Sequence, residues 1–533
     1  MRAVLIGLAV TCATVSVASE LDLLPLGPTE LAYEQGSATA GTFFDTAAAG
    51  TVELDELITR LARADVVLLG EEHTALDQKL LQAQLVDGIA ATGRRVVLAM
   101  EFFQRDDREA LEKWVAGELD DRGLLEATGW YDRGSYRWEY TRPVMEVARA
   151  RQLKVVGANV PRDIPRTVNR QGLDGLTEEQ QAEVGEVAVD GSAQHRYLVA
   201  RYFGDTVALL PPSWFGNMYA AQCLWDVVMA RSVLDEVADG TTVVLVVGSG
   251  HVAYRLGISR RLDDERAASG LPPLEIATFC PVTAPAPDPD GEPSGHPMGG
   301  GQHADGDDDP PAIFARSLAD YVGVFPDRGG IDAFPTLGLR LSADDDGRPK
   351  VSMVWPDTLA EAVGFASGDL ILDVNGRSPE DLSDLRFLLA DLEWGERAGV
   401  LVERDGSELE IAALLYPNVT VAPAELAPGS TVEELAAFDP HLPLTPGEIV
   451  VPEDQARWRL VTRDGGAARV EMRSGDVLAE VHELDDDGRV SRSLYRTTRD
   501  GGAVEIRYQR GEAGAVVATE AFDRTGARIE DGS

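Results

Sequence analysis

Two apolar runs, each followed closely by a histidine, constrain the fold of this chain more than any other feature. The first is Val66–Leu69, ahead of His73, and the second is Val243–Val247, ahead of His251. Continuous runs of β-branched and aliphatic residues are typical of strands buried on both faces of a parallel sheet. Ligands of such sheets bind beyond the carboxyl ends of the strands. We therefore expect both histidines on one rim of one sheet, where a functional site would lie.

Helical and strand-like patterns alternate along residues 52–280, which predicts an α/β domain with a mostly parallel sheet flanked by helices. We place this domain at residues 20–280. Helices are predicted at Leu54–Ala64, Ala75–Ala90, Asp107–Gly117, Pro143–Arg151 and Met218–Val237. Strands are predicted at Val66–Leu69, Val96–Met100, Val155–Gly157 and Val243–Val247.

The sequence changes character after this domain. Residues 281–312 are rich in proline, glycine and aspartate, which indicates a flexible linker. Farther on, residues 416–533 contain an internal repeat, since Arg463–Ala467 recurs as Arg499–Ala503. Asp-Gly turns between runs of alternating polar and apolar residues indicate antiparallel hairpins. We expect this C-terminal region to form a small antiparallel β-meander.

The first 19 residues are typical of a secretory signal peptide, with Arg2 ahead of an apolar run that ends in small residues. No later run approaches the about 18 apolar residues of a membrane span. We therefore expect an exported protein without a transmembrane span: periplasmic, attached to the cell envelope or extracellular.

The three cysteines leave two questions open. Cys12 could anchor the chain as a lipoprotein, although Ala9–Thr11 is a poor lipidation box. Removal of the signal peptide leaves Cys223 and Cys280, an even pair in an oxidising compartment. These two residues could form a disulfide or remain two buried thiols.

The charge of the chain excludes one class of partner. The sequence has 48 basic and 90 acidic residues, a net charge of −42 at pH 7. Such a chain repels nucleic acid phosphates, so we expect no nucleic acid binding.

Ionisable and amide side chains follow each predicted strand. Because the carboxyl ends of parallel strands share a rim, we expect these side chains to gather there as one site. In chain order they are Glu71, His73, Glu101, Asn159, Arg162 and His251.

The helix after His73 predicts the charge states at this rim. Thr74–Asp77 has the pattern of a capping box, which places His73 beside a helix N-terminus. The positive end of a helix disfavours an imidazolium and favours anions. We therefore expect a neutral His73, with Glu71 or Glu72 ionised.

The segment after the linker carries a long and specific motif: Pro356–Phe365 followed by Gly368–Gly376. Residues 313–415 thereby resemble a bacterial PDZ domain. The resemblance implies that Leu337, Gly338 and Leu339 form the loop that receives a C-terminal or extended peptide, which adds to the sheet edge as a strand. The alternative is a PDZ-shaped module whose groove is filled from within the chain.

The α/β domain also resembles a known family. Its matching pieces, in family order, are Leu69–His73, Ala99–Phe103, Ala158–Arg162, Ala221–Ala230 and Val247–Ala253. The domain is similar to the ChaN-like haem-binding proteins, relatives of the Tiki, TraB and erythromycin esterase group. The resemblance implies a protein that binds haem in iron uptake or haem handling, and the wider superfamily implies a Glu/His site used in hydrolysis.

Haem needs an apolar slot, an axial ligand and partners for its propionates. Aromatic residues interleaved with arginines near residues 130–142, and a second aromatic group near residues 197–219, could supply the slot. The axial ligand could be a tyrosinate from these groups, His195 or His251, or the thiolate of Cys280. The candidates for haem or another ligand are His73, Tyr136, Tyr140, Asn159, Arg162, His195 and His251. A homodimer is left open.

The competing chemistry is hydrolytic. Glu71 and Glu101 would orient or deprotonate a water, while His73 and His251 would stabilise developing charge or hold a divalent metal. No Gly-x-Ser-x-Gly motif accompanies them, which disfavours a covalent mechanism. A third interpretation makes the chain a PDZ-based adaptor with a vestigial α/β site.

Overall fold

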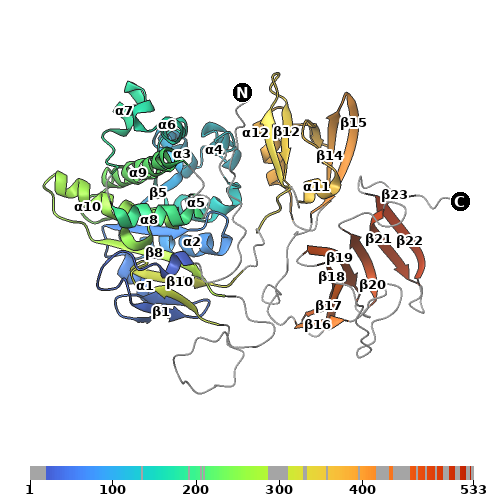
Figure 1. The fold of residues 1–533 in the computed structure, drawn as a ribbon, viewed down its shortest axis with the longest axis horizontal. Coiled ribbons are helices and arrows are strands. Elements are labelled where there is room, and N and C mark those ends of the chain that lie inside the picture. Colours follow the sequence, from blue (N-terminus) through green and yellow to red (C-terminus); the bar gives the residue numbers. More distant parts are fainter. Residues whose placement is uncertain are drawn as a thin grey trace, which may run out of the picture. The chain divides into compact units, whose positions relative to one another are not determined.

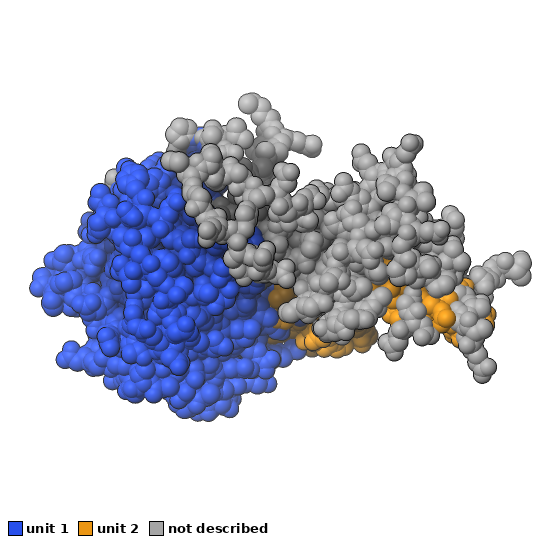
Figure 2. All heavy atoms as spheres, turned by 90° about the horizontal axis from the view of Figure 1, so that it is seen from below, with its two compact units in different colours: residues 1–286, 296–327 blue, residues 287–295, 328–533 orange. Residues whose placement is uncertain are grey.

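In the computed structural model the chain forms two compact units, residues 1–286 with 296–327 and residues 287–295 with 328–533 (Figure 2). The expected signal peptide, Cys12 and most of the expected linker lie outside the residues that the structure describes. Those residues are 20–285, 310–415 and the strands between 431 and 529, apart from short gaps at 134–135, 190–191, 205–206, 208–210, 328–332, 356–357 and 394–396.

An eight-stranded sheet forms the centre of the first unit (Figure 1). In order across the sheet its strands are β3 (Gly50–Val52), β2 (Phe43–Asp45), β10 (Tyr321–Phe325), β8 (Ile276–Thr283), β4 (Val66–Glu71), β7 (Thr241–Gly248), β5 (Arg95–Gln104) and β6 (Lys154–Asn159). From β10 to β6 every neighbouring pair is parallel, while β2 and β3 pair antiparallel at one edge. The predicted α/β fold with a mostly parallel sheet is therefore confirmed.

Helices connect the parallel strands (Figure 1). They are α1 (Leu54–Leu61), α2 (Leu76–Ala91), α3 (Arg108–Val115), α4 (Asp121–Ala127), α5 (Trp138–Arg151), α6 (Asp163–Gln171), α7 (Glu178–Val184), α8 (Ala193–Tyr202), α9 (Pro212–Leu234) and α10 (Ile258–Ala268). The long helix α9 packs against β6, and α6 and α10 pack against α9. Helix α5 begins before its predicted start at Pro143, so this proline lies inside the helix.

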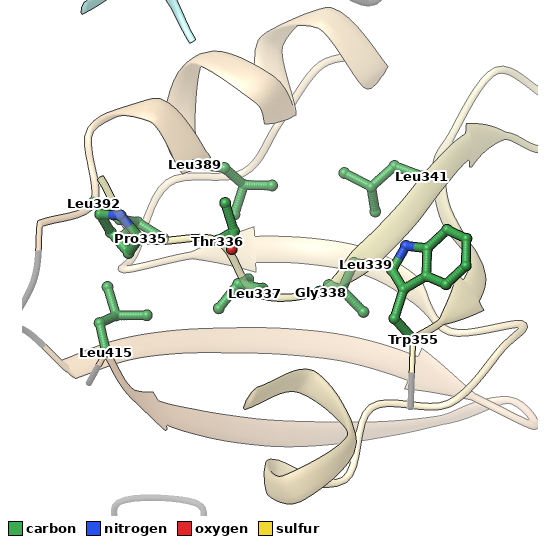
Figure 3. A pocket seen from close by; sticks show the side chains of 10 residues that line it. All are labelled: Pro335, Thr336, Leu337, Gly338, Leu339, Leu341, Trp355, Leu389, Leu392 and Leu415. Carbon is green, nitrogen blue, oxygen red and sulfur yellow. The ribbon is translucent and has the colours of Figure 1, made fainter. Parts of the chain in front are cut away.

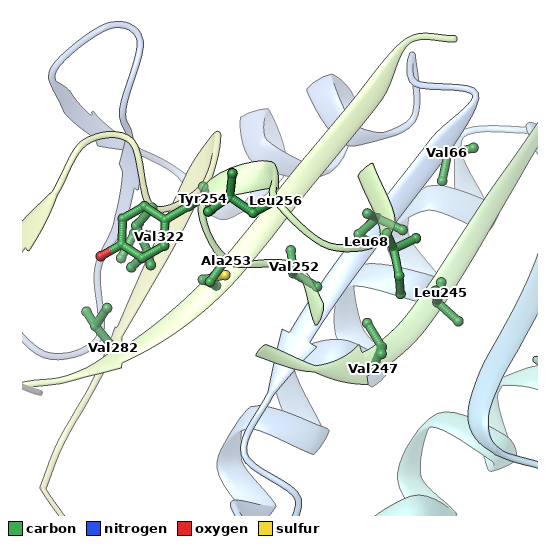
Figure 4. Close-up of a cluster of buried hydrophobic side chains, with 14 of the residues drawn as sticks. Val66, Leu68, Leu245, Val247, Val252, Ala253, Tyr254, Leu256, Val282 and Val322 are labelled. Carbon is green, nitrogen blue, oxygen red and sulfur yellow. The ribbon is translucent and has the colours of Figure 1, made fainter. Parts of the chain in front are cut away.

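The central strands are buried along their whole length, as their apolar runs predict. Every residue of β4 and β7 is buried. Val66 and Leu68 of β4 belong to the same core cluster as Leu245 and Val247 of β7 (Figure 4). Burial of each such side chain contributes about 1.5–3 kcal/mol. The packing of these two strands therefore fixes the positions from which the following residues start.

After β8 the chain leaves the sheet and later returns to it as β10. Strand β10 pairs in parallel with β8, and β9 (Ala312–Ala315) pairs with β1 (Gln35–Ala38) in a separate two-stranded sheet. Residues 312–325 therefore belong to the α/β domain, whereas the sequence placed them in the linker and the PDZ domain. Phe314 and Val322, both 0% exposed, fill the core of the first unit. These short strands are defined by partners far away in the sequence.

The second unit begins with a five-stranded antiparallel sheet. Its strands are β11 (Leu339–Ala343), β12 (Pro349–Val354), β13 (Leu370–Val374), β14 (Arg397–Arg404) and β15 (Ser407–Leu414), and its helices are α11 (Leu359–Val363) and α12 (Leu382–Ala390). Asp369, in the Gly-Asp pair of the predicted motif, is 1% exposed. It accepts hydrogen bonds from Arg404 and from the backbone N–H of Ala366, so the motif aspartate ties β14 to the turn before β13.

The C-terminal region is an eight-stranded sheet in which each strand pairs antiparallel with the next. Its strands are β16 (Thr431–Leu435), β17 (Ala456–Arg463), β18 (Gly466–Ser474), β19 (Val477–Leu484), β20 (Val490–Tyr495), β21 (Ala503–Arg510), β22 (Val516–Asp523) and β23 (Arg528–Ile529). Both copies of the repeat lead into a strand, β18 and β21. The predicted β-meander is confirmed.

Cys223 and Cys280 are buried free thiols, so of the two alternatives left open by the sequence the disulfide is excluded. Within the described parts of the chain, no helix is both long enough and apolar enough to cross a membrane.

Candidate functional site

The two histidines follow neighbouring strands. Strands β4 and β7 are parallel, and Glu71 pairs in register with Gly248. The segments that lead to His73 and His251 therefore start from the same rim, as the sequence predicts. A Cβ atom at Gly248 would lie 2.9 Å from Cε1 of His73, closer than side chains approach in proteins. Glycine at this position lets the imidazole rest directly on the end of β7.

Glu71 joins a buried lysine to His73. Its side chain is 0% exposed, and Oε2 forms an ion pair with Nζ of Lys79 in α2. Its Oε1 lies 3.1 Å from Nδ1 of His73. Burial raises the pKa of Glu71, but the charge of Lys79 and the hydrogen bond from His73 outweigh it and hold this pKa below its ordinary value. The ionised carboxylate of Glu71 is therefore placed to accept a proton from Nδ1 of His73.

Glu101 reaches across the rim from β5. Its Oε2 accepts the backbone N–H of Gly248 at 2.7 Å, and its Oε1 lies 3.9 Å from Nε2 of His251. The pairing of β5 with β6 is irregular between Met100 and Gln104, a stretch that includes this residue. Gly157 permits the irregularity, because a Cβ atom there would lie 1.9 Å from the carbonyl oxygen of Gln104. The irregular end of β5 thus positions Glu101 over the end of β7.

His251 is held by a carboxylate from the helix beneath it. Its Nδ1 lies 2.6 Å from Oδ1 of Asp226 in α9, and Oδ2 of Asp226 lies 3.3 Å from Nε2 of His195 in α8. Burial raises the pKa of Asp226, but hydrogen bonds from His195 and His251 outweigh it and keep it below its ordinary value. Burial lowers the pKa of His195, yet Asp226 raises it overall to about 9. Asp226 is therefore an ionised, fully buried partner of two imidazoles.

Asn159 and Arg162 have different surroundings. Asn159 donates from Nδ2 to the carbonyl oxygen of Glu101 at 3.2 Å, and its Oδ1 accepts the N–H of Val160 at 2.9 Å. Arg162 is exposed, immediately before α6. Asn159 thus fixes the backbone beside Glu101, and Arg162 is the solvent-facing cation of this rim segment.

The predicted aromatic residues divide into core and surface. Trp130 and Trp138 are buried, and so is Tyr140, which is 4% exposed within α5. Tyr136 is 42% exposed, and its ring centroid lies 5.0 Å from that of His73. Phe102 lies at the same distance from His73. The aromatic surface beside the rim histidine is therefore formed by Tyr136 and Phe102.

The expected capping box after His73 is not formed. Helix α2 begins at Leu76, and no side chain caps its N-terminus. The carboxylate of Asp77 instead accepts the N–H of Gln78, and Oε1 of Gln78 accepts the N–H of Glu72 at 2.7 Å. A glutamine side chain therefore closes the turn between β4 and α2.

The possible metal site at His73 and His251 finds no support. Among the residues that the structure describes, no group of three or more His, Cys, Asp or Glu side chains is arranged to hold a metal ion. Each histidine instead directs Nδ1 to its own carboxylate, Glu71 or Asp226.

Two residues of the site were not predicted, Lys79 and Asp226. Both lie inside helices, and both are buried, 1% and 0% exposed. A signal existed for Asp226, because it is a lone carboxylate within the apolar stretch Cys223–Ala230. A charged residue in such a stretch must have a buried partner.

The second unit has a groove at the edge of its five-stranded sheet (Figure 3). The cavity has a volume of about 390 Å³, and its lining includes Leu337, Leu389, Leu392 and Trp355. The carbonyl of Leu337 accepts the N–H of Ala360 at 2.7 Å, so this carbonyl is engaged within the domain. The predicted loop residues Leu337, Gly338 and Leu339 all line the groove.

Comparison with known proteins agrees with this organisation. The sequence model of the family described as haem-binding uptake, Tiki superfamily, ChaN matches residues 57–262. Protein RETICULATA-RELATED 5, chloroplastic, of Arabidopsis thaliana is 24% identical over 210 residues, 37% of this chain and 28% of that protein. A probable periplasmic serine endoprotease DegP-like of Marinomonas sp. is 37% identical over 79 residues, 15% of this chain and 17% of that protein. The chain thus spans less than a third of either relative.

Among solved structures, that of cofacial haem binding to ChaN of Campylobacter jejuni is 17% identical, with a TM-score of 0.39. The match covers 53% of this chain and 95% of that one. By its sheets and its rim contacts, the protein is an α/β protein with a carboxylate–histidine rim, followed by a small antiparallel module. More specifically, it combines a ChaN-like domain, matched over residues 57–262, with a PDZ domain.

Proposed function

We propose that the ChaN-like domain binds haem at the rim of its sheet, with His73 as the residue that faces the iron. The observation that carries this proposal is the half-buried position of His73 and its contact with Glu71. Its side chain is 31% exposed, and its Nδ1 is held by the buried carboxylate of Glu71. A carboxylate on Nδ1 is the usual second partner of a histidine that ligates a metal through Nε2.

The surroundings of His73 fit a flat, largely apolar ligand. Tyr136 and Phe102 both contact the imidazole, with ring centroids 5.0 Å away, and they also contact each other. Their rings supply part of the apolar surface that haem requires, and Arg162, exposed at the rim segment, is a candidate partner for a propionate. When bound, haem would supply iron chemistry, while these residues orient it.

Titration of the mature chain with haemin tests the proposal. We expect a saturable Soret band in the wild type, a weaker or shifted band in His73→Ala and reduced affinity in Tyr136→Ala. Tyr33→Ala is the matched control, because Tyr33 is 83% exposed and precedes the sheet in the chain. A flat titration of the wild type would overturn the proposal.

A second function is favoured by the position of Glu101. Its carboxylate is fixed by Gly248 and lies 3.9 Å from Nε2 of His251, which suits a general base beside a histidine that stabilises charge. If the domain is a hydrolase, Glu101→Gln should abolish turnover of a panel of chromogenic esters and leave the melting temperature unchanged. Lack of turnover by the wild type would sink this alternative.

For the PDZ domain we propose binding of C-terminal or extended peptides in the groove between β11 and α12. Strand β11 lies at the edge of its sheet, so a peptide strand can add to it. We also propose that the chain is exported by its first 19 residues. Mass spectrometry of the processed protein should then find an N-terminus near Glu20. An N-terminus at Cys12 that carries radiolabelled palmitate would show lipid anchoring in place of this cleavage.

A further inference from the structure

A chain of polar groups runs from the rim into the interior of the ChaN-like domain. Oδ1 of Asp226 is hydrogen-bonded to His251, its Oδ2 lies within ion-pair distance of Nε2 of His195 at 3.3 Å, and Nδ1 of His195 lies 3.2 Å from the hydroxyl of Tyr219. Asp226, His195 and Tyr219 are 0%, 1% and 1% exposed. Burial of polar groups lowers stability unless they are hydrogen-bonded. Three such groups in an apolar core therefore point to a role other than stability.

Three separate elements build this chain. Asp226 comes from the apolar helix α9, His195 from α8, and His251 from the short helix η5 (Ser249–His251) that follows β7. Gln222 lies one turn before Asp226 on α9 and also reaches the ring of His251. The helix beneath the rim therefore presents two polar side chains to the same imidazole.

Asp226 and Gln222 require opposite hydrogen-bond roles of the same ring nitrogen of His251. Nδ1 of His251 lies 2.6 Å from Oδ1 of Asp226 and 2.9 Å from Nε2 of Gln222. One ring nitrogen of a neutral imidazole cannot both donate to the carboxylate and accept from the amide. A hydrogen bond to an ionised, fully buried carboxylate is the stronger and shorter of the two, so the carboxylate decides where the proton resides.

We infer that Asp226 is a positioning residue of the rim site, which holds His251 in the tautomer with its proton on Nδ1 and leaves Nε2 free beside Glu101. His195 holds Asp226 from the opposite side, so that the carboxylate cannot turn away. The inference rests on the proposed function in one respect, that this rim is where the ligand binds.

Two carboxylates face His251, and the one at Nδ1 is much the nearer, Asp226 at 2.6 Å against Glu101 at 3.9 Å from Nε2. Asp226 lies below the ring and Glu101 beside it, and His195 stands behind Asp226 with the Cys223 thiol near it. Burial lowers the pKa of His251, but Asp226 and then Glu101 raise it above its ordinary value. The tautomer is therefore to be measured above the titration of His251, where the ring is neutral.

The test is nitrogen-15 NMR of the full chain labelled at histidine, which distinguishes protonated from unprotonated ring nitrogens. The sequence has seven histidines, so the spectrum can be assigned with single His→Gln variants. In the wild type we expect His251 to carry its proton on Nδ1. In Asp226→Asn, the amide donates to Nδ1, so the proton should move to Nε2 and the titration midpoint of His251 should fall.

Asp107→Asn is the matched control, because Asp107 is a buried carboxylate whose described partners are Arg133 and the N–H of Gln104. It should leave the spectrum of His251 unchanged. A wild-type His251 with its proton on Nε2, or a tautomer that survives Asp226→Asn, would overturn the inference. If Asp226→Asn does not fold, the wild-type spectrum alone decides.

Haemin titration separates this inference from the proposed function. A flat titration together with the Nδ1 tautomer would reject haem binding and keep the positioning role. Haem binding together with the Nε2 tautomer would do the reverse.

Discussion

Lys79 and Glu71 form an ion pair in which the two side chains are only 2% and 0% exposed. A buried pair of this kind seldom stabilises a fold more than apolar residues would, because both charges lose their hydration. Its value here lies in the site, since the lysine keeps Glu71 ionised and Glu71 directs Nδ1 of His73. The buried charge of Lys79 is thereby linked, through Glu71, to an imidazole at the rim.

Replacement of this lysine should cost stability and change the site. Lys79→Met leaves the buried carboxylate of Glu71 without its counter-charge, and we expect the free energy of unfolding of the first unit to fall by about 3–5 kcal/mol. Chemical denaturation measures the loss. Lys113→Met is the control, because Lys113 is exposed on α3 and pairs with Glu109; it should show no measurable change. Equal effects of the two variants would contradict the role of the buried pair.

The N-terminal segment should make stability depend on pH. Burial, and then the charge of Glu72, raise the pKa of Asp22 from 3.8 to about 7. Between these values the folded state binds the proton more tightly, so stability falls as the pH rises. Asp22→Asn removes the titrating group. We expect this variant to gain stability over the wild type on going from pH 4 to pH 8 in thermal melts.

Asp55→Asn serves as the control for Asp22, since Asp55 lies on the exposed face of α1. Its difference from the wild type should be the same at both pH values. If the Asp22 variant shows the same pH slope as the wild type, another group causes the pH dependence.

Strand β9 offers a test of where the first unit ends. Phe314 is 0% exposed and packs edge-to-face on Phe44, with ring centroids 5.2 Å apart. We expect Phe314→Ala to destabilise the first unit by about 3–5 kcal/mol. Its neighbour Ile313 is 43% exposed, so Ile313→Ala should change stability by less than about 0.5 kcal/mol. If Phe314→Ala destabilised the PDZ domain and not the first unit, the assignment of β9 to the first unit would be wrong.

The PDZ groove can be blocked from α12. Leu389 lines the cavity and is partly buried, so Leu389→Asp should place a charge in the apolar groove and weaken a peptide with an apolar C-terminal residue at least about tenfold. Fluorescence polarisation measures the dissociation constant, with Asp391→Asn on the exposed helix end as the control. A larger residue at Gly338 would not serve as a block of the groove, because even a Cβ atom there would lie 2.3 Å from Cβ of Thr358. Undiminished binding by Leu389→Asp would mean that peptides bind elsewhere.

The sequence predicted the central sheet because continuous apolar runs such as Val243–Val247 carry their own evidence of burial. Strand β10 gave no comparable signal, because it has only five residues and its place in the sheet depends on pairing with β8. The proline- and glycine-rich stretch before it had the composition of a domain boundary, and composition does not reveal that the chain returns to the same sheet.

The same distinction applies to the site. Glu101 and the two histidines were predictable, because strand ends in a parallel sheet share a rim. Lys79 and Asp226 were not predicted, since their partners are reached by helix packing and not by spacing along the sequence. Tyr136 and Tyr140 stand four positions apart, yet one is exposed beside His73 and the other is buried in α5. Burial, which the sequence alone did not reveal, separates them.

The return of the chain as β10 also bears on how such a protein can be taken apart and recombined. The proline- and glycine-rich stretch is the obvious place to cut, but the excision of everything after it would remove an inner strand and leave Val322's place in the core empty. The seam between the two modules lies after Phe325. A chimaera that attaches another binding module to this α/β domain should therefore be joined there. A chimaera joined at the stretch itself would lack β10, and its sheet would be incomplete.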